Sequence, residues 1–167
     1  QAPSANANWT AGLGNSITAT YDNGGRTGKV TNGNFGEIQL FTTLEDVGAK
    51  KTDKITFSCD VKLLPLDNST EPDVSDYVYL GYSLYYDGTS YSPNWYTGAQ
   101  LKWDADTAGA KYGEWTRLYI VFPGYTGNVN YQKLMFGVIG YANRANNDIK
   151  FVTRNWKIEK GNKPTDW

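Results

Sequence analysis

Apolar and polar residues alternate one by one along several segments of this chain, and this alternation restricts its fold more than any other feature. In KITFSCDVKL (54–63), every second residue from Ile55 to Leu63 is apolar, and the residues between them are polar. Because successive side chains of a strand point to opposite faces, the pattern predicts a half-buried strand. The same reasoning predicts strands in DYVYLGYSLYY (76–86), EWTRLYIVF (114–122), KLMFGVIGYA (133–142) and DIKFVTRNWKIE (148–159), of which 133–142 is nearly apolar on both faces.

Shorter strands are predicted nearer the start of the chain, in NSITATYD (15–22), RTGKVTN (26–32) and GEIQLFTT (36–43). Turn-forming stretches such as DNGG, LPLDNSTEP and PGYTGN separate the strands. About eight strands divided by turns favour an all-β fold, an antiparallel β-sandwich of the jelly-roll kind. No linker or repeat divides the sequence, so residues 1–167 are interpreted as one module. We expect this module to be excised from a longer chain.

Charge and composition exclude several classes of function. The chain carries 16 basic and 17 acidic residues, which leaves no basic surface for nucleic acid and no polybasic patch for a membrane. The sequence contains no His, so a Ser-His-Asp triad, a Cys-His pair and a His-ligated zinc site are all excluded. The single Cys59 cannot form an internal disulfide, and its place in the alternation predicts a buried thiol.

One loop combines turn-forming residues with large rings. The stretch SYSPNWYTGAQLKW (90–103) contains Tyr91, Trp95, Tyr96 and Trp103 among Ser, Pro, Asn and Gly. The rings can fold back as a satellite cluster that caps the sandwich, because exposed aromatic groups are uncommon. They can also form a surface for sugars, because a pyranose presents C–H groups to a flat ring and hydroxyls to nearby amides. The second interpretation is favoured here.

The expected binding surface has a floor and an overhang. The outer faces of two strands, which carry Tyr77, Tyr79, Tyr85, Arg117 and Tyr119, are expected to form the floor. The residues expected to overhang it or flank it are Tyr91, Asn94, Trp95, Tyr96, Gln100 and Trp103. Cross-strand pairing of aromatic residues beneath a loop explains the same pattern without a ligand, and the sequence leaves both interpretations open.

Catalysis and metal binding have weaker support. Glycoside hydrolysis needs two carboxylates about 5–10 Å apart. No pair stands out among the acidic candidates Glu37, Glu45, Asp46, Asp104, Asp106 and Glu114, so an enzyme is not expected. No cofactor is expected either. A structural calcium ion in an Asp- and Asn-rich turn stays open, but no loop has the D-x-D-x-D-G spacing that would make it specific.

The last stretch, FVTRNWKIEKGNKPTDW (151–167), resembles the closing strand and tail of carbohydrate-binding-like modules in phage tail and baseplate proteins. Those modules often end in K-L-E-K-G-N-K-A-T-D-W. Here Ile158 stands in the Leu position and Pro164 replaces Ala, while Glu159 to Lys163 match. ITFSCDVKL and GEWTRLYIVF agree with the family in outline. The likeness is greatest to an insertion module of an enlarged distal tail protein of phages that infect lactic acid bacteria.

The resemblance implies a jelly-roll module that binds cell-wall polysaccharide of the bacterial host during adsorption, without catalysis. It implies a place in the virion, acting at the bacterial cell surface, with other tail or baseplate subunits as partners and with neither nucleic acid nor membrane. The alternative is a structural spacer that has lost saccharide binding. Related modules often hold calcium with an Asp in the last strand, and Asn155 takes that position here, which puts the ion in doubt.

Overall fold

The computed structural model describes residues 9–11, 17–22, 25–30, 35–65, 77–86, 96–102, 113–127, 131–141 and 149–165. These residues form ten strands and no helix, so no helix in this part of the chain is long and apolar enough to cross a membrane. The strands are β1 (Trp9–Ala11), β2 (Ile17–Asp22), β3 (Gly25–Val30), β4 (Phe35–Thr43), β5 (Ile55–Pro65), β6 (Tyr77–Tyr86), β7 (Tyr96–Lys102), β8 (Thr116–Phe122), β9 (Tyr131–Tyr141) and β10 (Ile149–Lys160).

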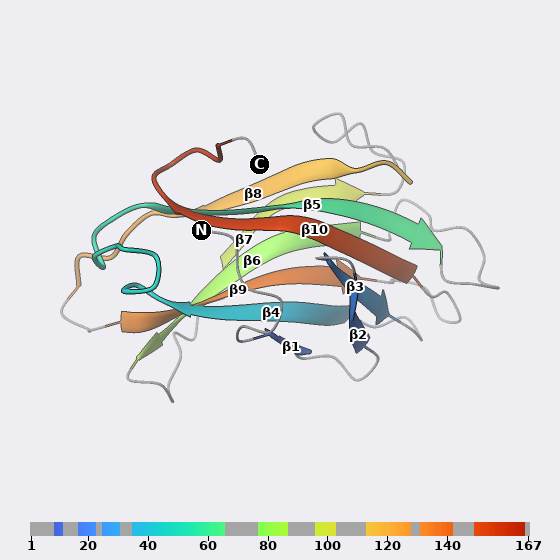
Figure 1. Cartoon of the computed structure of the whole chain (residues 1–167), viewed down its shortest axis with the longest axis horizontal. Helices are drawn as coiled ribbons and strands as arrows, with labels where there is room; N and C mark the ends of the chain where they lie inside the picture. Colours follow the sequence, from blue (N-terminus) through green and yellow to red (C-terminus); the bar gives the residue numbers. More distant parts are fainter. Residues whose placement is uncertain are drawn as a thin grey trace.

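The strands lie in two antiparallel sheets that pack face to face (Figure 1). Sheet A has the order β1-β4-β9-β6-β7, and sheet B has the order β2-β3-β10-β5-β8. Most connections carry the chain from one sheet to the other, so that strands close in sequence face each other across the core. This architecture confirms the prediction of an all-β, antiparallel jelly-roll sandwich.

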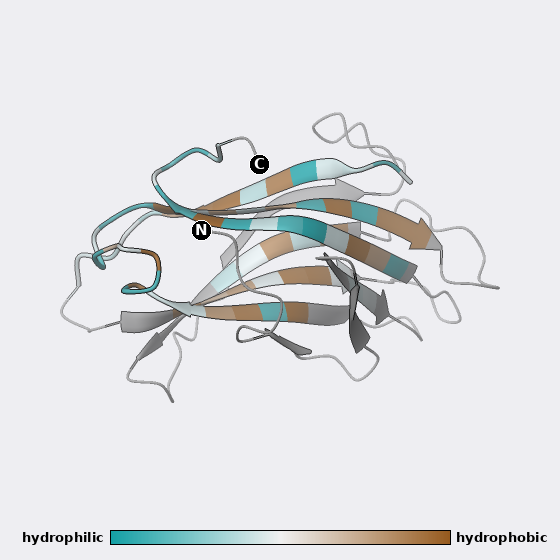
Figure 2. Cartoon of the chain, in the orientation of Figure 1, coloured by the Kyte–Doolittle hydropathy of each residue, from teal (hydrophilic) through white to brown (hydrophobic). Residues whose placement is uncertain are grey.

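Alternation along the strands supplies the core between the sheets. On β5, every second residue from Ile55 to Leu63 is fully buried, as the sequence predicts. The ring of Phe57 on β5 lies 4.8 Å from that of Phe136 on β9 and 5.0 Å from that of Trp156 on β10, so these rings join the two sheets. Figure 2 shows the alternating apolar and polar positions along β5 and β10. Each such side chain contributes about 1.5–3 kcal/mol by leaving water.

A β-bulge interrupts the last strand. Arg154 of β10 pairs with Asp60 of β5, but the next pair along is Lys157 with Ser58, so two residues of β10 face one of β5. Asn155, in the bulge, has φ 53°, a left-handed conformation that Asn tolerates better than most residues. The extra residue places Trp156 in the core, where the ring is 3% exposed.

The motif that follows the bulge makes hydrogen bonds to the tail and to residues at the start of β5. Glu159 accepts hydrogen bonds from the Thr165 backbone N–H at 3.0 Å and the Thr165 hydroxyl at 2.5 Å, which turns the tail back on the strand. Gly161, with φ 131°, donates its N–H to the Lys54 carbonyl at 2.7 Å and accepts from the Thr56 hydroxyl at 2.9 Å. Glu159 and Gly161, two of the matched residues, therefore make contacts within the module.

Candidate functional site

Five of the eleven predicted binding residues lie on two paired strands of sheet A. Tyr77, Tyr79 and Tyr85 lie on β6, and Tyr96 and Gln100 lie on β7, the strand that pairs with it. Gln100 is the direct register partner of Tyr79. Tyr91, Asn94 and Trp95, in the sequence between these strands, and Trp103, which follows β7, lie outside the described residues.

Arg117 and Tyr119 lie elsewhere. Both belong to β8, the edge strand of sheet B, and they alternate with the core residues Leu118 and Ile120. Their side chains therefore project from the outer face of sheet B, whereas Tyr79 projects from the outer face of sheet A. The structure consequently does not join the β6 and β8 residues into the single floor expected from the sequence, because their strands belong to different sheets.

The outer face of sheet A carries residues that the sequence analysis did not select. Three register rows cross the strands β4, β9 and β6, in this order: Glu37–Ile139–Tyr79, Gln39–Gly137–Gly81 and Phe41–Met135–Ser83. The described side chains and glycines of these rows are called the sheet A surface, namely Gln39, Phe41, Tyr79, Gly81, Met135, Gly137 and Ile139. The signal for it in the sequence was strand 133–142, which is apolar on both faces where one apolar face suffices for a core.

The middle of the sheet A surface is shielded from water. Met135 is 4% exposed and Ile139 is 2% exposed, although neither belongs to the core cluster between the sheets. Phe41 and Tyr79, at opposite corners of the surface, are partly exposed. By contrast, Tyr119 on the outer face of sheet B is 47% exposed. The outer face of sheet A is thus apolar and shielded at its middle, whereas that of sheet B is polar and includes both buried residues, such as Ser58, and the exposed Tyr119.

A pair of glycines lies at the centre of the sheet A surface. Gly137 of β9 is directly paired with Gly81 of β6, and Gln39 of β4 is paired with Gly137 on its other side. Neither glycine carries a side chain, but both are buried and Gln39 is 9% exposed, so the centre of this surface is covered. At the corners, the partly exposed rings of Phe41 and Tyr79 offer apolar planes of the kind against which the C–H groups of a pyranose pack.

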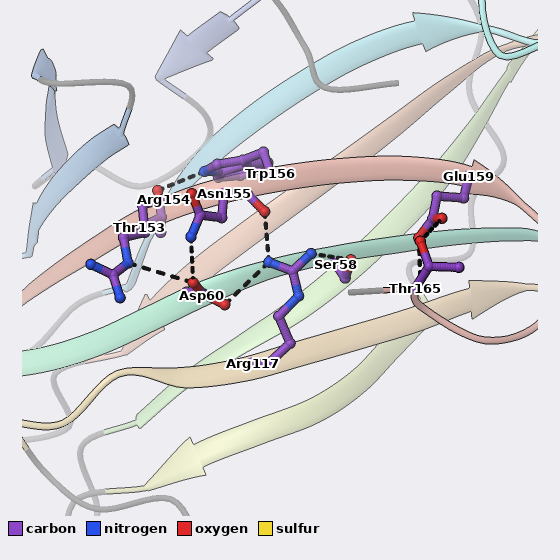
Figure 3. A network of polar contacts seen from close by, with 9 residues as sticks. All are labelled: Ser58, Asp60, Arg117, Thr153, Arg154, Asn155, Trp156, Glu159 and Thr165. Atoms are coloured by element: carbon purple, nitrogen blue, oxygen red, sulfur yellow. Dashed lines mark hydrogen bonds and ion pairs between the residues drawn. The ribbon is translucent and has the colours of Figure 1, made fainter. Parts of the chain in front are cut away.

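The outer face of sheet B holds a polar network instead (Figure 3). Nη1 of Arg117 binds Oδ1 of Asp60 at 3.1 Å and the Asn155 carbonyl oxygen at 2.6 Å, and Nη2 binds the Ser58 hydroxyl at 2.8 Å. The Asn155 amide donates to the other carboxylate oxygen of Asp60 at 2.7 Å. Arg117 is thus engaged with β5 and β10 of its own sheet, which ties three strands together at the bulge.

This network does not fit a metal ion. The carboxylate that Asn155 contacts, that of Asp60, is surrounded by donors from Arg117, Arg154 and Asn155 itself. A cation binding there would face a guanidinium group at close range. Within the described ranges, no group of three or more Asp, Glu or Cys residues is placed to hold a metal ion.

The acidic candidates for catalysis that the structure describes lie in a turn after β4, on β4 itself and just before β8. Glu45, Asp46 and Glu114 are exposed, and Asp46 accepts a hydrogen bond from the Thr43 backbone N–H at 3.3 Å, which fixes a turn. Glu37 lies on β4, next to Ile139 of β9. Asp104 and Asp106 lie outside the described residues. Cys59 is a fully buried core residue, and this burial raises the pKa of its thiol. The thiol is therefore no nucleophile at neutral pH.

Known proteins resemble this chain in structure. No family model matches the sequence, and no curated protein matches it. A solved carbohydrate-binding module of the β-sandwich superfamily, described as promiscuous in specificity, superposes with a TM-score of 0.56 at 9% identity over 91% of this chain and 58% of its own. The tailspike protein 4 enzymatically active domain of bacteriophage CBA120 also gives 0.56, at 6% identity, over 92% of this chain and 19% of its own.

A family 11 carbohydrate-binding module from Clostridium thermocellum, solved with a β-1,3-1,4-mixed-linked tetrasaccharide, matches over 92% of this chain and 89% of its own, with a TM-score of 0.50 and 15% identity. The chain spans 58% and 19% of the first two structures, so their remaining parts have no counterpart in it. At these identities the likeness concerns architecture. The chain has the two-sheet β-sandwich fold found in carbohydrate-binding modules.

Proposed function

We propose that this chain is a non-catalytic saccharide-binding module whose ligand lies against the sheet A surface. The observation that carries the proposal is the place of two partly exposed aromatic residues, Phe41 and Tyr79, at opposite corners of one apolar sheet face. Two further observations support it. The fold is that of solved carbohydrate-binding modules, and the aromatic segment 87–95 joins two strands of the same sheet.

The parent protein is proposed to be a phage tail or baseplate protein, and its ligand the cell-wall polysaccharide of a bacterial host. Support comes from the tail motif from Glu159 to Lys163, whose likeness to modules of phage tail proteins was noted above. A domain of a phage tailspike shares the fold, although not the sequence. On this proposal the module works at the bacterial surface, as part of the virion.

Binding by one such module is expected to be weak, because two or three stacking contacts must offset the loss of rotational and translational freedom. Copies repeated around a tail raise the effective concentration of the remaining sites once one has bound. Firm attachment then needs no covalent step and no conformational switch.

A structural spacer is the second candidate, and one observation favours it. Met135 and Ile139 are shielded by the protein itself, which is what a sheet covered for stability would show. In that case the rings of sheet A serve packing or contacts with other tail subunits.

A polysaccharide microarray separates these functions. The tagged module is expected to bind a defined subset of bacterial wall polysaccharides, and the same soluble polysaccharide is expected to abolish decoration of lactic acid bacteria by the module. A folded protein that binds no saccharide and no cell supports the spacer. Release of reducing ends from a bound polysaccharide would contradict a non-catalytic role.

A further inference from the structure

Two cationic side chains, Lys62 and Arg154, contact the indole of Trp115 on the outer face of sheet B, the face opposite to the sheet A surface. The Nζ atom of Lys62 on β5 lies 4.6 Å from the ring centroid of Trp115, and Cζ of Arg154 on β10 lies 4.0 Å from it. Trp115 directly precedes β8. The two cationic groups are therefore no farther apart than the sum of these distances.

The Arg154 guanidinium is oriented with its outer edge free. Its Nε atom lies 3.5 Å from Oδ2 of Asp60, so one edge faces the sheet while the ring of Trp115 supports its plane. The terminal nitrogens make no hydrogen bond within the described ranges, and the side chain is 46% exposed. Figure 3 shows these nitrogens pointing away from the Asp60 carboxylate.

The nearby carboxylate of Asp60 neutralises this pair only in part. Asp60 is shared by Arg117, Asn155 and Arg154, so its carboxylate is already surrounded by donors. Lys62 has no ion-pair partner among the residues that the structure describes, and Glu114, which precedes Trp115, binds neither cation there. Two like charges near one ring repel each other, and an anion bound beside them reduces that repulsion.

We propose that Lys62 and Arg154, positioned by Trp115, form an anion-binding site for a phosphate or carboxylate group carried by a polysaccharide. The free edge of an arginine presents two parallel N–H donors that match both groups, and a lysine adds a point charge. The Nε contact and the indole hold the fork in place before the ligand arrives, which reduces the entropy lost on binding. The polysaccharide carrier rests on the proposed function, whereas the cationic pair itself lies on the opposite sheet from the proposed saccharide surface and needs no contact with it.

Dextrans that differ only in their charged group test the proposal. Phosphorylated dextran, carboxymethyl dextran and unmodified dextran are titrated into the whole chain by calorimetry at low ionic strength. At least one anionic dextran is expected to bind roughly tenfold more tightly than the unmodified one, with an affinity that falls as salt is added. Preference for the phosphorylated polymer assigns the site to phosphate, and preference for the carboxymethylated one assigns it to carboxylate.

Variants show whether the pair is responsible. Lys62→Gln combined with Arg154→Gln is expected to abolish the preference, whereas Lys50→Gln combined with Lys163→Gln removes the same charge from exposed positions and leaves it unchanged. Equal losses in both double variants would mean that total charge alone attracts the polymer, which overturns the site. So would equal binding of all three dextrans. Arg154→Lys keeps the charge and loses the fork; if the glutamine variant does not fold, loss of most of the preference in Arg154→Lys supports the site and full retention overturns it.

Discussion

Arg117 on β8 donates a hydrogen bond across β5 to the backbone carbonyl of Asn155 on β10, with 2.6 Å between Nη1 and the oxygen. Asn155 is the bulge residue with left-handed φ, and the next residue, Trp156, fills the core against Phe57. Arg117 therefore stabilises the backbone conformation that places an indole between the sheets. Arg117, which the sequence analysis assigned to the binding surface, thus stabilises sheet B.

Replacement of Arg117 by Met is expected to lower the free energy of unfolding by about 1–3 kcal/mol, because Asp60, Ser58 and the Asn155 carbonyl lose a partly buried partner. Urea denaturation measures the change. Lys163→Met, at an exposed position, is the control and is expected to have almost no effect. If Arg117→Met weakened saccharide binding while stability stayed the same, Arg117 would belong to the binding site after all.

Replacement of Gly28 by Ala is expected to destabilise sheet B. A Cβ atom at Gly28 of β3 would lie 2.3 Å from Cζ of Phe151, whose ring is fully buried and occupies the space beside the glycine. Accommodating it requires a shift of the ring or of β3, at a cost of about 1–3 kcal/mol. The matched variant Thr27→Ala changes the neighbouring position of the same strand. Equal thermal midpoints for the two variants would contradict the close packing of Phe151.

Acidification is expected to weaken the hydrogen bonds between Glu159 and Thr165. Burial raises the pKa of Glu159, but hydrogen bonds from Thr165 and Lys157 outweigh it, so the net pKa lies below the ordinary value of 4.5. Because the pKa of Glu159 is lower in the folded state, its ionised carboxylate stabilises the fold at pH values above the ordinary pKa. This stability is lost as the pH falls through the folded-state pKa. Glu159→Gln should therefore be about 0.5–1 kcal/mol less stable than the native protein at neutral pH. This difference in the free energy of unfolding should disappear in acid. A difference that does not depend on pH would exclude ionisation of Glu159 as its source.

Trp95 provides a test of the aromatic segment between β6 and β7. Trp95→Ala is expected to weaken binding to host cells several-fold and to shift the thermal midpoint by no more than a few degrees, because the sequence predicts that the indole contacts the ligand. Cell-binding assays and thermal denaturation of the same preparation measure both effects. A large fall in the midpoint would assign Trp95 to the core.

Alternation alone was enough to predict the sandwich and much of its core. Val78, Leu80 and Tyr82 of β6 and Leu118, Ile120 and Phe122 of β8 are all buried, as their spacing predicts. Periodicity works here because each strand has one face against the other sheet. The bulge left a trace too: the buried positions of β10 change from odd numbers, at Phe151 and Thr153, to even numbers, at Trp156 and Ile158. A change of parity at an Asn is a readable sign of an extra residue.

The pairing of strands could not be predicted in the same way. Alternation shows that Arg117 and Tyr79 both point away from the core, but it does not show to which sheet each strand belongs. That depends on contacts between residues far apart in the sequence, such as Asp60 with Arg117. The sheet A surface was missed for the same reason, because Gly81 meets Gly137 only through the register of β6 and β9.

Two tyrosines on opposite outer faces give the most direct test of the saccharide surface. Tyr79→Ala and Tyr119→Ala remove the same side chain from sheet A and sheet B, and a polysaccharide that the native module binds is titrated into each variant by calorimetry. Loss of one stacking contact is expected to weaken binding about tenfold in Tyr79→Ala, with native affinity in Tyr119→Ala. Native affinity in a folded Tyr79→Ala variant, with binding lost in Tyr119→Ala, would contradict the assignment to sheet A.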